Sequence, residues 1–164
     1  MRTWSEAFAE QAKSNRRAYY LLTGSSLPAS HRLHYLRMWL EKLCKAYVLE
    51  SQMEAFRTTH NIVAKVLPRL IEQRWRTVQF ERMPDIASIR ALCREIDHLH
   101  PQVHDNNRRP DNVEYPWLGS AGGIDVPAQW KFPLSSRLYS NVGRLLLKAA
   151  DRLTENPGLF IRRG

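Results

Sequence analysis

Apolar residues recur at steps of three and four along most of this chain, which is the period of an amphipathic helix. The first stripe begins at Trp4 and Phe8 and predicts a helix that ends near Leu22. Thr3 and Glu6 have the spacing of a capping box, in which each residue satisfies a backbone N–H at the start of the helix. The N-terminal segment is therefore predicted to be a capped surface helix.

The same period predicts four further helices. They run from Ser30 to Glu50, from a cap at Thr58 or Thr59 through Ile71, from Pro84 to Leu99, and from Ser135 or Ser136 to Leu153. Pro68 lies inside the third of them, where the missing N–H and the ring of a proline should kink or divide a helix.

Residues 101–133 lack this period and are rich in proline and glycine. Loops of this length are uncommon in compact domains and are often functional. Alternating stretches on either side of Gly122 and Gly123 are compatible with a β-hairpin. The chain is predicted to be one all-α domain, residues 1–164, folded as an up-and-down bundle of four to five helices with a long irregular loop at about 101–133 and a basic C-terminal tail at 156–164.

The composition is that of a globular protein with a strong positive charge. The net charge is +9, and the sequence pI is about 10, which favours a phosphate-bearing partner, although an Arg-rich genome produces the same bias. No apolar run approaches the roughly 18 residues that span a bilayer, and no signal peptide is evident, so we expect a cytoplasmic protein that does not insert in membranes. Cys44 and Cys93 have no companions that would suggest a zinc site.

The second and third predicted helices resemble the HEPN domain (higher eukaryotes and prokaryotes nucleotide-binding). The resemblance lies in "LHYLRMWLEKLCKAYVLE" and "TTHNIVAKVLPRL", and "QAKSNRRAYYLL" in the first helix is similar to the opening segment of the family. It covers roughly residues 9–100, and Arg37 stands where the family often has Gln. The matching residues are Glu41, Lys42, Lys45, Ala46, Thr59, His60, Val63 and Leu67.

The resemblance implies an all-helical bundle that often forms a homodimer. Members occur in RNA-cutting toxins, in defence systems and as nucleotide-binding domains. The catalytic members carry an Arg followed, after four to six residues, by a His, and both subunits contribute to a metal-independent RNase site. Arg94 and His100 are the pair with this spacing, although chance alone gives about two such pairs in a chain of this composition.

In such a site a His would move the proton of a ribose 2'-hydroxyl, and an Arg would stabilise the charge on the phosphate. We assign the phosphate to Arg94 and the proton to His100 or, failing that, to His98, which shares a helix face with Arg94. The alternative is a helix C-terminus at which histidines favour the helix dipole and cap carbonyl groups.

The long loop offers a second candidate site. Arg108 and Arg109 could bind a phosphate while Tyr115 and Trp117 stack a base. Equally, the aromatic residues could simply pack the loop onto the bundle. We favour packing for the aromatic residues and leave the Arg pair available for binding.

Other charged groups have weaker claims to a function. His31, His34 and His60 would form a metal site only if they converged, so neither a metal nor a cofactor is predicted. Arg37, Glu41 and Lys45 are spaced by four, which predicts exposed or half-buried ion pairs worth tenths of a kcal/mol. We interpret Glu41 and Lys42 as a pair that stabilises the bundle.

Two functional hypotheses follow. The first is a HEPN-like protein that engages RNA or nucleotide phosphates, with RNase activity of a toxin or defence type. The alternative is a non-catalytic helical module whose basic surface and Trp-bearing loop bind a protein partner.

Overall fold

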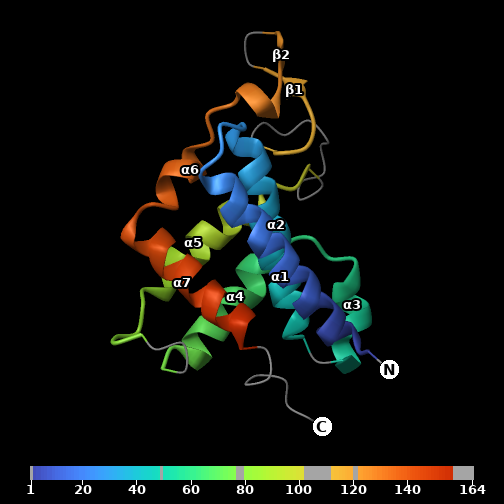
Figure 1. Ribbon diagram of the computed structural model, residues 1–164, viewed down its shortest axis with the longest axis vertical. Helices are drawn as coiled ribbons and strands as arrows, with labels where there is room; N and C mark the ends of the chain where they lie inside the picture. Colours follow the sequence, from blue (N-terminus) through green and yellow to red (C-terminus); the bar gives the residue numbers. More distant parts are fainter. Residues whose placement is uncertain (1, 49, 77–79, 102–111, 120–121, 157–164) are drawn as a thin grey trace.

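The computed structural model describes residues 2–48, 50–76, 80–101, 112–119 and 122–156. It shows the predicted all-α bundle (Figure 1). In the described part of the chain, the five longer helices are α1 (Trp4–Thr23), α2 (Ala29–Ala46), α4 (Val63–Arg74), α5 (Ile86–Asp97) and α7 (Asn141–Glu155), and two short ones are α3 (Met53–Arg57) and α6 (Pro133–Arg137).

α1 and α2 form an antiparallel pair that runs through the middle of the molecule (Figure 1). The predicted capping box is present, because the Glu6 N–H donates to Thr3 Oγ1 at 3.2 Å and the Thr3 N–H donates to Glu6 Oε2 at 2.9 Å. α1 ends at Thr23, with Gly24 as its C-cap. The capping-box signal at the start of this helix is therefore confirmed.

α4 and α5 form the second pair, and α7 packs against α1, α2 and α5. α4 passes through Pro68 without being divided. α5 begins at Ile86, and Asp85 caps it, since its carboxylate accepts the backbone N–H groups of Ala87 and Ser88. The indole of Trp39 on α2 donates to Thr154 Oγ1 on α7 at 2.8 Å, so a buried hydrogen bond joins the central helix to the last one.

Several helix boundaries differ from the predicted ones. α2 ends at Ala46, and a 3₁₀ turn (Glu50–Gln52) and the short α3 follow where a break was expected. The last predicted helix is divided into α6 and α7, because the Ser140 hydroxyl caps a new helix by accepting from the Gly143 N–H at 3.1 Å. A Cβ at Gly143 would lie 2.4 Å from the Leu138 carbonyl oxygen, so the turn between the two helices needs glycine here.

The described part of the long loop contains the hairpin with which its sequence is compatible. β1 (Trp117–Leu118) pairs with β2 (Ile124–Asp125) in an antiparallel register that places Leu118 opposite Ile124. Gly122 has φ +80°, a left-handed conformation that glycine adopts readily. The hairpin projects beyond the end of the bundle (Figure 1), and a 3₁₀ turn (Pro127–Gln129) leads back toward α6.

The core lies between the two helix pairs and α7. Aliphatic side chains from α2 fill its centre, and Ile62, Ile71, Ile89 and Ile96 close it from the α4–α5 side. The fully buried residues also include Leu33, Leu36, Trp39, Leu40, Val63, Leu67, Cys93, Leu146 and Leu153. A group of charged side chains is buried beside this apolar core.

Candidate functional site

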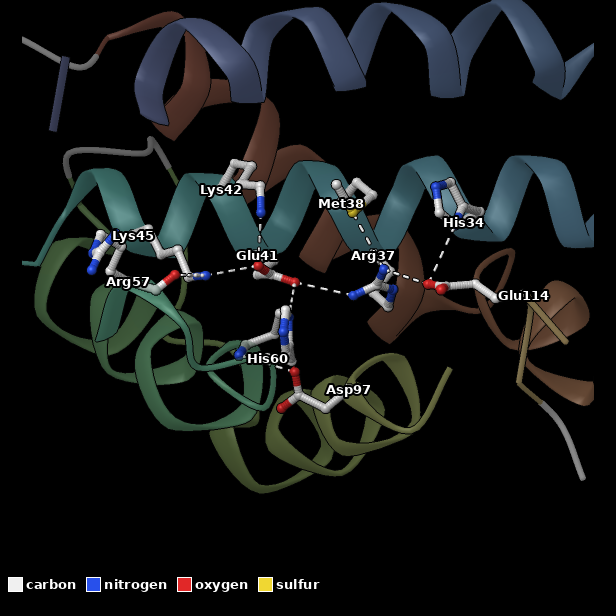
Figure 2. Close-up of polar contacts among 11 residues, drawn as sticks. His34, Arg37, Met38, Glu41, Lys42, Lys45, Arg57, His60, Asp97 and Glu114 are labelled. Carbon is white, nitrogen blue, oxygen red and sulfur yellow. Dashed lines mark hydrogen bonds and ion pairs between the residues drawn. The ribbon is translucent and has the colours of Figure 1, made fainter. Parts of the chain in front are cut away.

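A largely buried group of charged residues lies where α2 meets α4 and α5 (Figure 2). We call it the Glu41 cluster, and we define it as Arg37, Glu41, Lys42, Lys45, His60, Asp97 and His100. The prediction of exposed or half-buried ion pairs was wrong, because Arg37, Glu41 and Lys45 are at most 2% exposed. Spacing along a helix does not reveal which face its neighbours cover.

Glu41 stands at the centre of the cluster. Its Oε1 accepts the ammonium groups of Lys42 and Lys45, both at 2.8 Å, and its Oε2 accepts Arg37 Nη1 at 3.0 Å. Burial tends to raise the pKa of this carboxyl group, but the hydrogen bonds and charges of Lys42 and Lys45 outweigh burial and lower the pKa to about 2. Glu41 is therefore a carboxylate at neutral pH, held by three cations.

Arg37 extends the cluster to the loop before β1. Its Nη2 donates to Glu114 Oε1 at 2.8 Å, and His34 Nδ1 lies 3.7 Å from the same oxygen. Asn112 shapes this segment, since its side-chain oxygen accepts the backbone N–H groups of Glu114 and Tyr115. The charge of Arg37 thus fastens one end of the long loop to α2.

Two histidines stack beside Glu41. The rings of His60 and His100 are 4.1 Å apart between centroids and inclined by 10°. His100 is buried, and burial, followed by the charge of Arg37, lowers its pKa to about 4. The side chain of His60 is 40% exposed, and its buried Nδ1 lies 3.5 Å from Glu41 Oε2. His60 therefore presents an accessible imidazole whose inner nitrogen faces a carboxylate.

Asp97 joins the end of α5 to the beginning of α4. Its carboxylate accepts the backbone N–H groups of Val63 at 3.1 Å and Ala64 at 2.9 Å. Burial raises the pKa of Asp97 to about 6, although these two N–H groups act in the opposite direction. The predicted cap at Thr58 or Thr59 was wrong, because α4 begins at Val63 and its cap comes from a distant helix.

The residues of the predicted catalytic set lie in different environments. Arg94 is exposed on the last turns of α5, His98 is half-buried as the C-cap of that helix, and His100 is buried. The His98 N–H donates to the Arg94 carbonyl oxygen at 3.0 Å, which keeps these two residues on one turn. His100 instead stacks on His60, which the sequence offered only as a match to the family resemblance and as one of three possible metal ligands.

The predicted loop site is described only in part. Arg108 and Arg109 lie outside the described residues. Trp117 is buried and packs edge-on against Trp130, with 5.4 Å between ring centroids, whereas Tyr115 is 59% exposed. Trp117 therefore helps to hold the loop together, and Tyr115 is the aromatic residue of this set that solvent reaches.

The histidines considered as metal ligands occupy separate places. His31 is exposed, His34 lies beside Glu114, and His60 lies beside Glu41. Over the described ranges no group of three or more His, Cys, Asp or Glu side chains is arranged to hold a metal ion. None of the helices there is both long and apolar enough to cross a membrane.

Sequence reasoning missed the two features that bring this site together. His60 and His100 are forty residues apart in the sequence, and only the approach of α5 to the turn before α4 brings them together. Asp97 likewise reaches a helix start more than thirty residues away. The one local signal was the run Arg37–Glu41–Lys45, which sits among the buried leucines of α2.

The cluster combines an accessible imidazole, an ionised carboxylate and several cations, which are the groups required for proton transfer beside a phosphate. No protein-family model, curated protein or solved structure matches the chain.

Proposed function

We propose that the chain is a HEPN-like helical bundle that engages RNA as a cytoplasmic homodimer and cleaves it without a metal ion. The observation that carries the proposal is the position of His60, whose outer edge is accessible while Glu41 faces its inner nitrogen. A carboxylate in that position favours one orientation and tautomer of an imidazole. The other ring nitrogen is then available to accept a proton.

The end of α5 supplies the other groups that the reaction needs. His98 is two residues before His100, so the Cα atoms of these two residues are within about 7 Å. The ring of His100 in turn stacks on that of His60. Arg94 lies one turn earlier and is exposed. We assign proton abstraction to His60, proton donation to His98 and stabilisation of the phosphate charge to Arg94. His100 is a positioning residue, because it is buried and its low pKa keeps it neutral.

The reaction balances with these groups alone. His60 takes the proton of a ribose 2'-hydroxyl, and the oxygen forms a bond to phosphorus. The bond from phosphorus to the 5'-oxygen breaks, and His98 returns a proton to that oxygen. The products are a 2',3'-cyclic phosphate and a 5'-hydroxyl end.

An aromatic residue with a neighbouring cation supports RNA as the substrate. The Arg57 guanidinium lies 5.7 Å from the centroid of the Trp4 ring, and Trp4 is 50% exposed. Arg57 is three residues before His60, and its carbonyl oxygen accepts Lys45 Nζ of the Glu41 cluster at 2.9 Å. An unpaired base could stack on Trp4 while its phosphate contacts Arg57.

Cleavage of total RNA in EDTA tests the proposal. We expect the wild-type protein to cleave, and the variants His60→Gln, His98→Gln and Arg94→Gln each to lose about 100-fold or more in rate. His31→Gln is the matched control, because His31 is an exposed histidine at the start of α2. The absence of wild-type cleavage, or equal rates for His60→Gln and His31→Gln, would remove the enzyme proposal.

Binding is measured separately from cleavage. The affinity for single-stranded RNA should fall steeply between 50 and 200 mM salt, since each phosphate contact releases a counterion. Trp4→Ala should weaken binding without changing the salt slope, because stacking does not involve counterions. No binding at the lowest salt would exclude RNA as the ligand.

A non-catalytic interaction module remains the second candidate function, and the hairpin favours it. Leu118 and Ile124 are opposite each other in the register and are 58% and 70% exposed. Exposed aliphatic pairs of this kind favour a partner with an apolar surface. Such binding should persist at high salt and disappear in the double variant Leu118→Ser/Ile124→Ser, while RNA binding should be unaffected by that change.

A further inference from the structure

A pocket of about 530 Å³ opens between α1 and α7, and it is separate from the residues assigned to RNA cleavage. α1 contributes most of its wall through residues spaced by three and four, which share one face of the helix. The volume falls in the range of small-molecule sites. The lining residues are Lys13, Arg16, Arg17, Tyr20, Leu21, Thr154 and Glu155.

The base of the pocket is held in place by contacts between the two helices. Arg16 Nε donates to Asp151 Oδ1 at 2.5 Å, and Arg16 Nη2 donates to Glu155 Oε1 at 2.8 Å. The Tyr20 hydroxyl donates to Asp151 Oδ2 at 2.6 Å, and the Arg16 guanidinium lies 5.7 Å from the Tyr20 ring centroid. These contacts fix a guanidinium and a ring before any ligand arrives, which lowers the entropic cost of binding.

Two further cations line the pocket without taking part in that network. Lys13 and Arg17 are four residues apart on α1, an arrangement that is unfavourable for like charges on a helix. Lys13 has a loose ion pair with Glu10 at 3.9 Å, and in the part of the chain that the structure describes Arg17 has no ion pair. An anion between them would relieve the repulsion, and an Arg can hold a phosphate through two hydrogen bonds.

The remaining wall is apolar and exposed. Tyr20 is 42% exposed and Leu21 is 74% exposed. A flat aromatic group could cover Leu21 and stack on the Tyr20 ring, where the nearby Arg16 adds a cation–π contact. The pocket thus offers an apolar surface beside a cationic one.

We propose that this pocket binds a small aromatic molecule that carries a phosphate. Lys13 and Arg17 hold the phosphate, and Tyr20 and Leu21 hold the aromatic group. Glu155 stays paired with Arg16, so it leaves the two outer cations to the ligand.

Titrations of the full chain with phenyl phosphate, inorganic phosphate and phenol test the proposal, with binding measured by calorimetry or by NMR shifts. We expect phenyl phosphate to bind at least about tenfold more tightly than either fragment. Arg17→Gln and Lys13→Gln should each weaken phenyl phosphate binding by about five- to tenfold. Arg144→Gln, an exposed Arg on α7 outside the pocket, is the matched control and should leave it unchanged.

Two results would overturn the proposal. The first is equal affinity for phenyl phosphate and inorganic phosphate, and the second is the same affinity for Arg17→Gln as for Arg144→Gln. Adenosine monophosphate distinguishes two sources of the ligand: tighter binding than phenyl phosphate assigns the pocket to nucleotides, and weaker binding assigns it to phosphorylated phenols. RNA cleavage should be unchanged in Arg17→Gln, so the two proposals succeed or fail independently.

Discussion

The Glu41 cluster and the pocket between α1 and α7 contain similar ion pairs in different surroundings. The side chains of Glu41 and Lys45 are each 1% exposed, whereas those of Arg16 and Glu155 are 27% and 54% exposed. In the cluster, removal of one partner leaves a buried charge that water cannot solvate. In the pocket, water replaces a lost partner. Burial therefore decides whether a charged group serves mainly the fold or remains available for a ligand.

The strongest test of this contrast is Glu41→Gln. The substitution leaves Arg37, Lys42 and Lys45 around an uncharged amide, so we expect the free energy of unfolding to fall by about 3 to 5 kcal/mol. Urea unfolding at pH 7 measures it.

Glu54→Gln is the control, because Glu54 pairs with Arg57 at 2.9 Å on the surface. It should cost no more than about 1 kcal/mol. Equal losses for the two variants would contradict the view that burial sets the importance of these charges.

The pH dependence of stability separates two members of the cluster. The pKa of Asp97 is raised to about 6, so between about pH 4 and 6 the folded protein binds more protons than the unfolded chain at this site. Its contribution to stability is therefore present at low pH and is lost as the pH rises through 6. Relative to wild type, Asp97→Asn should gain about 3 kcal/mol between pH 4 and 7, as measured by urea unfolding across that range.

The contribution of His100 to stability changes with pH in the opposite direction. Its pKa is lowered to about 4, so the folded protein binds fewer protons than the unfolded chain between about pH 4 and 6.5. Its contribution is fully present above pH 6.5 and is lost as the pH falls toward 4. His100→Asn should therefore gain about 3 kcal/mol relative to wild type as the pH falls from 7 to 4. If the stability of each variant changed with pH in parallel with that of the wild type, neither Asp97 nor His100 would be buried in solution.

A smaller effect is expected where the core meets the pocket. Trp39→Phe removes the hydrogen bond from the indole to Thr154 Oγ1 and leaves a slightly smaller ring in a fully buried site. We expect the free energy of unfolding to fall by about 1 to 2 kcal/mol. Thr154→Val keeps the shape of the side chain and should cost a similar amount, and their double variant should cost less than the sum if the bond is the cause.

Local signals in the sequence predicted much of the fold. The capping box at Thr3 and Glu6 and the helical stripes of α1 and α2 depend on residues a few positions apart, and the structure confirms them. The hairpin also forms around Gly122, which takes the left-handed conformation that its turn requires. Such features are decided by neighbours along the chain.

The candidate site was harder to predict from the sequence, because its contacts are long-range. The spacing of Arg37, Glu41 and Lys45 is the same for an exposed row of ion pairs and for a buried one. Their burial depends on the packing of α4 and α5 against α2, and the stacking of His60 on His100 depends on the same approach. The pocket likewise depends on a long-range contact, because α7 supplies the wall opposite α1.

The smallest expected effect is that of Arg16→Gln, which removes the ion pairs of the pocket base. Asp151 keeps its hydrogen bond from Tyr20, and the side chain of Glu155 is about half exposed. The free energy of unfolding should therefore fall by about 1 kcal/mol or less. Salt distinguishes this loss from that of Glu41→Gln: 0.5 M NaCl should shrink the Arg16 effect and leave the Glu41 effect nearly unchanged, because ions screen exposed pairs far more than buried ones. A loss above about 2 kcal/mol that persists in salt would mean that Arg16 is as buried as the Glu41 cluster, and the pocket would then be closed to a charged ligand.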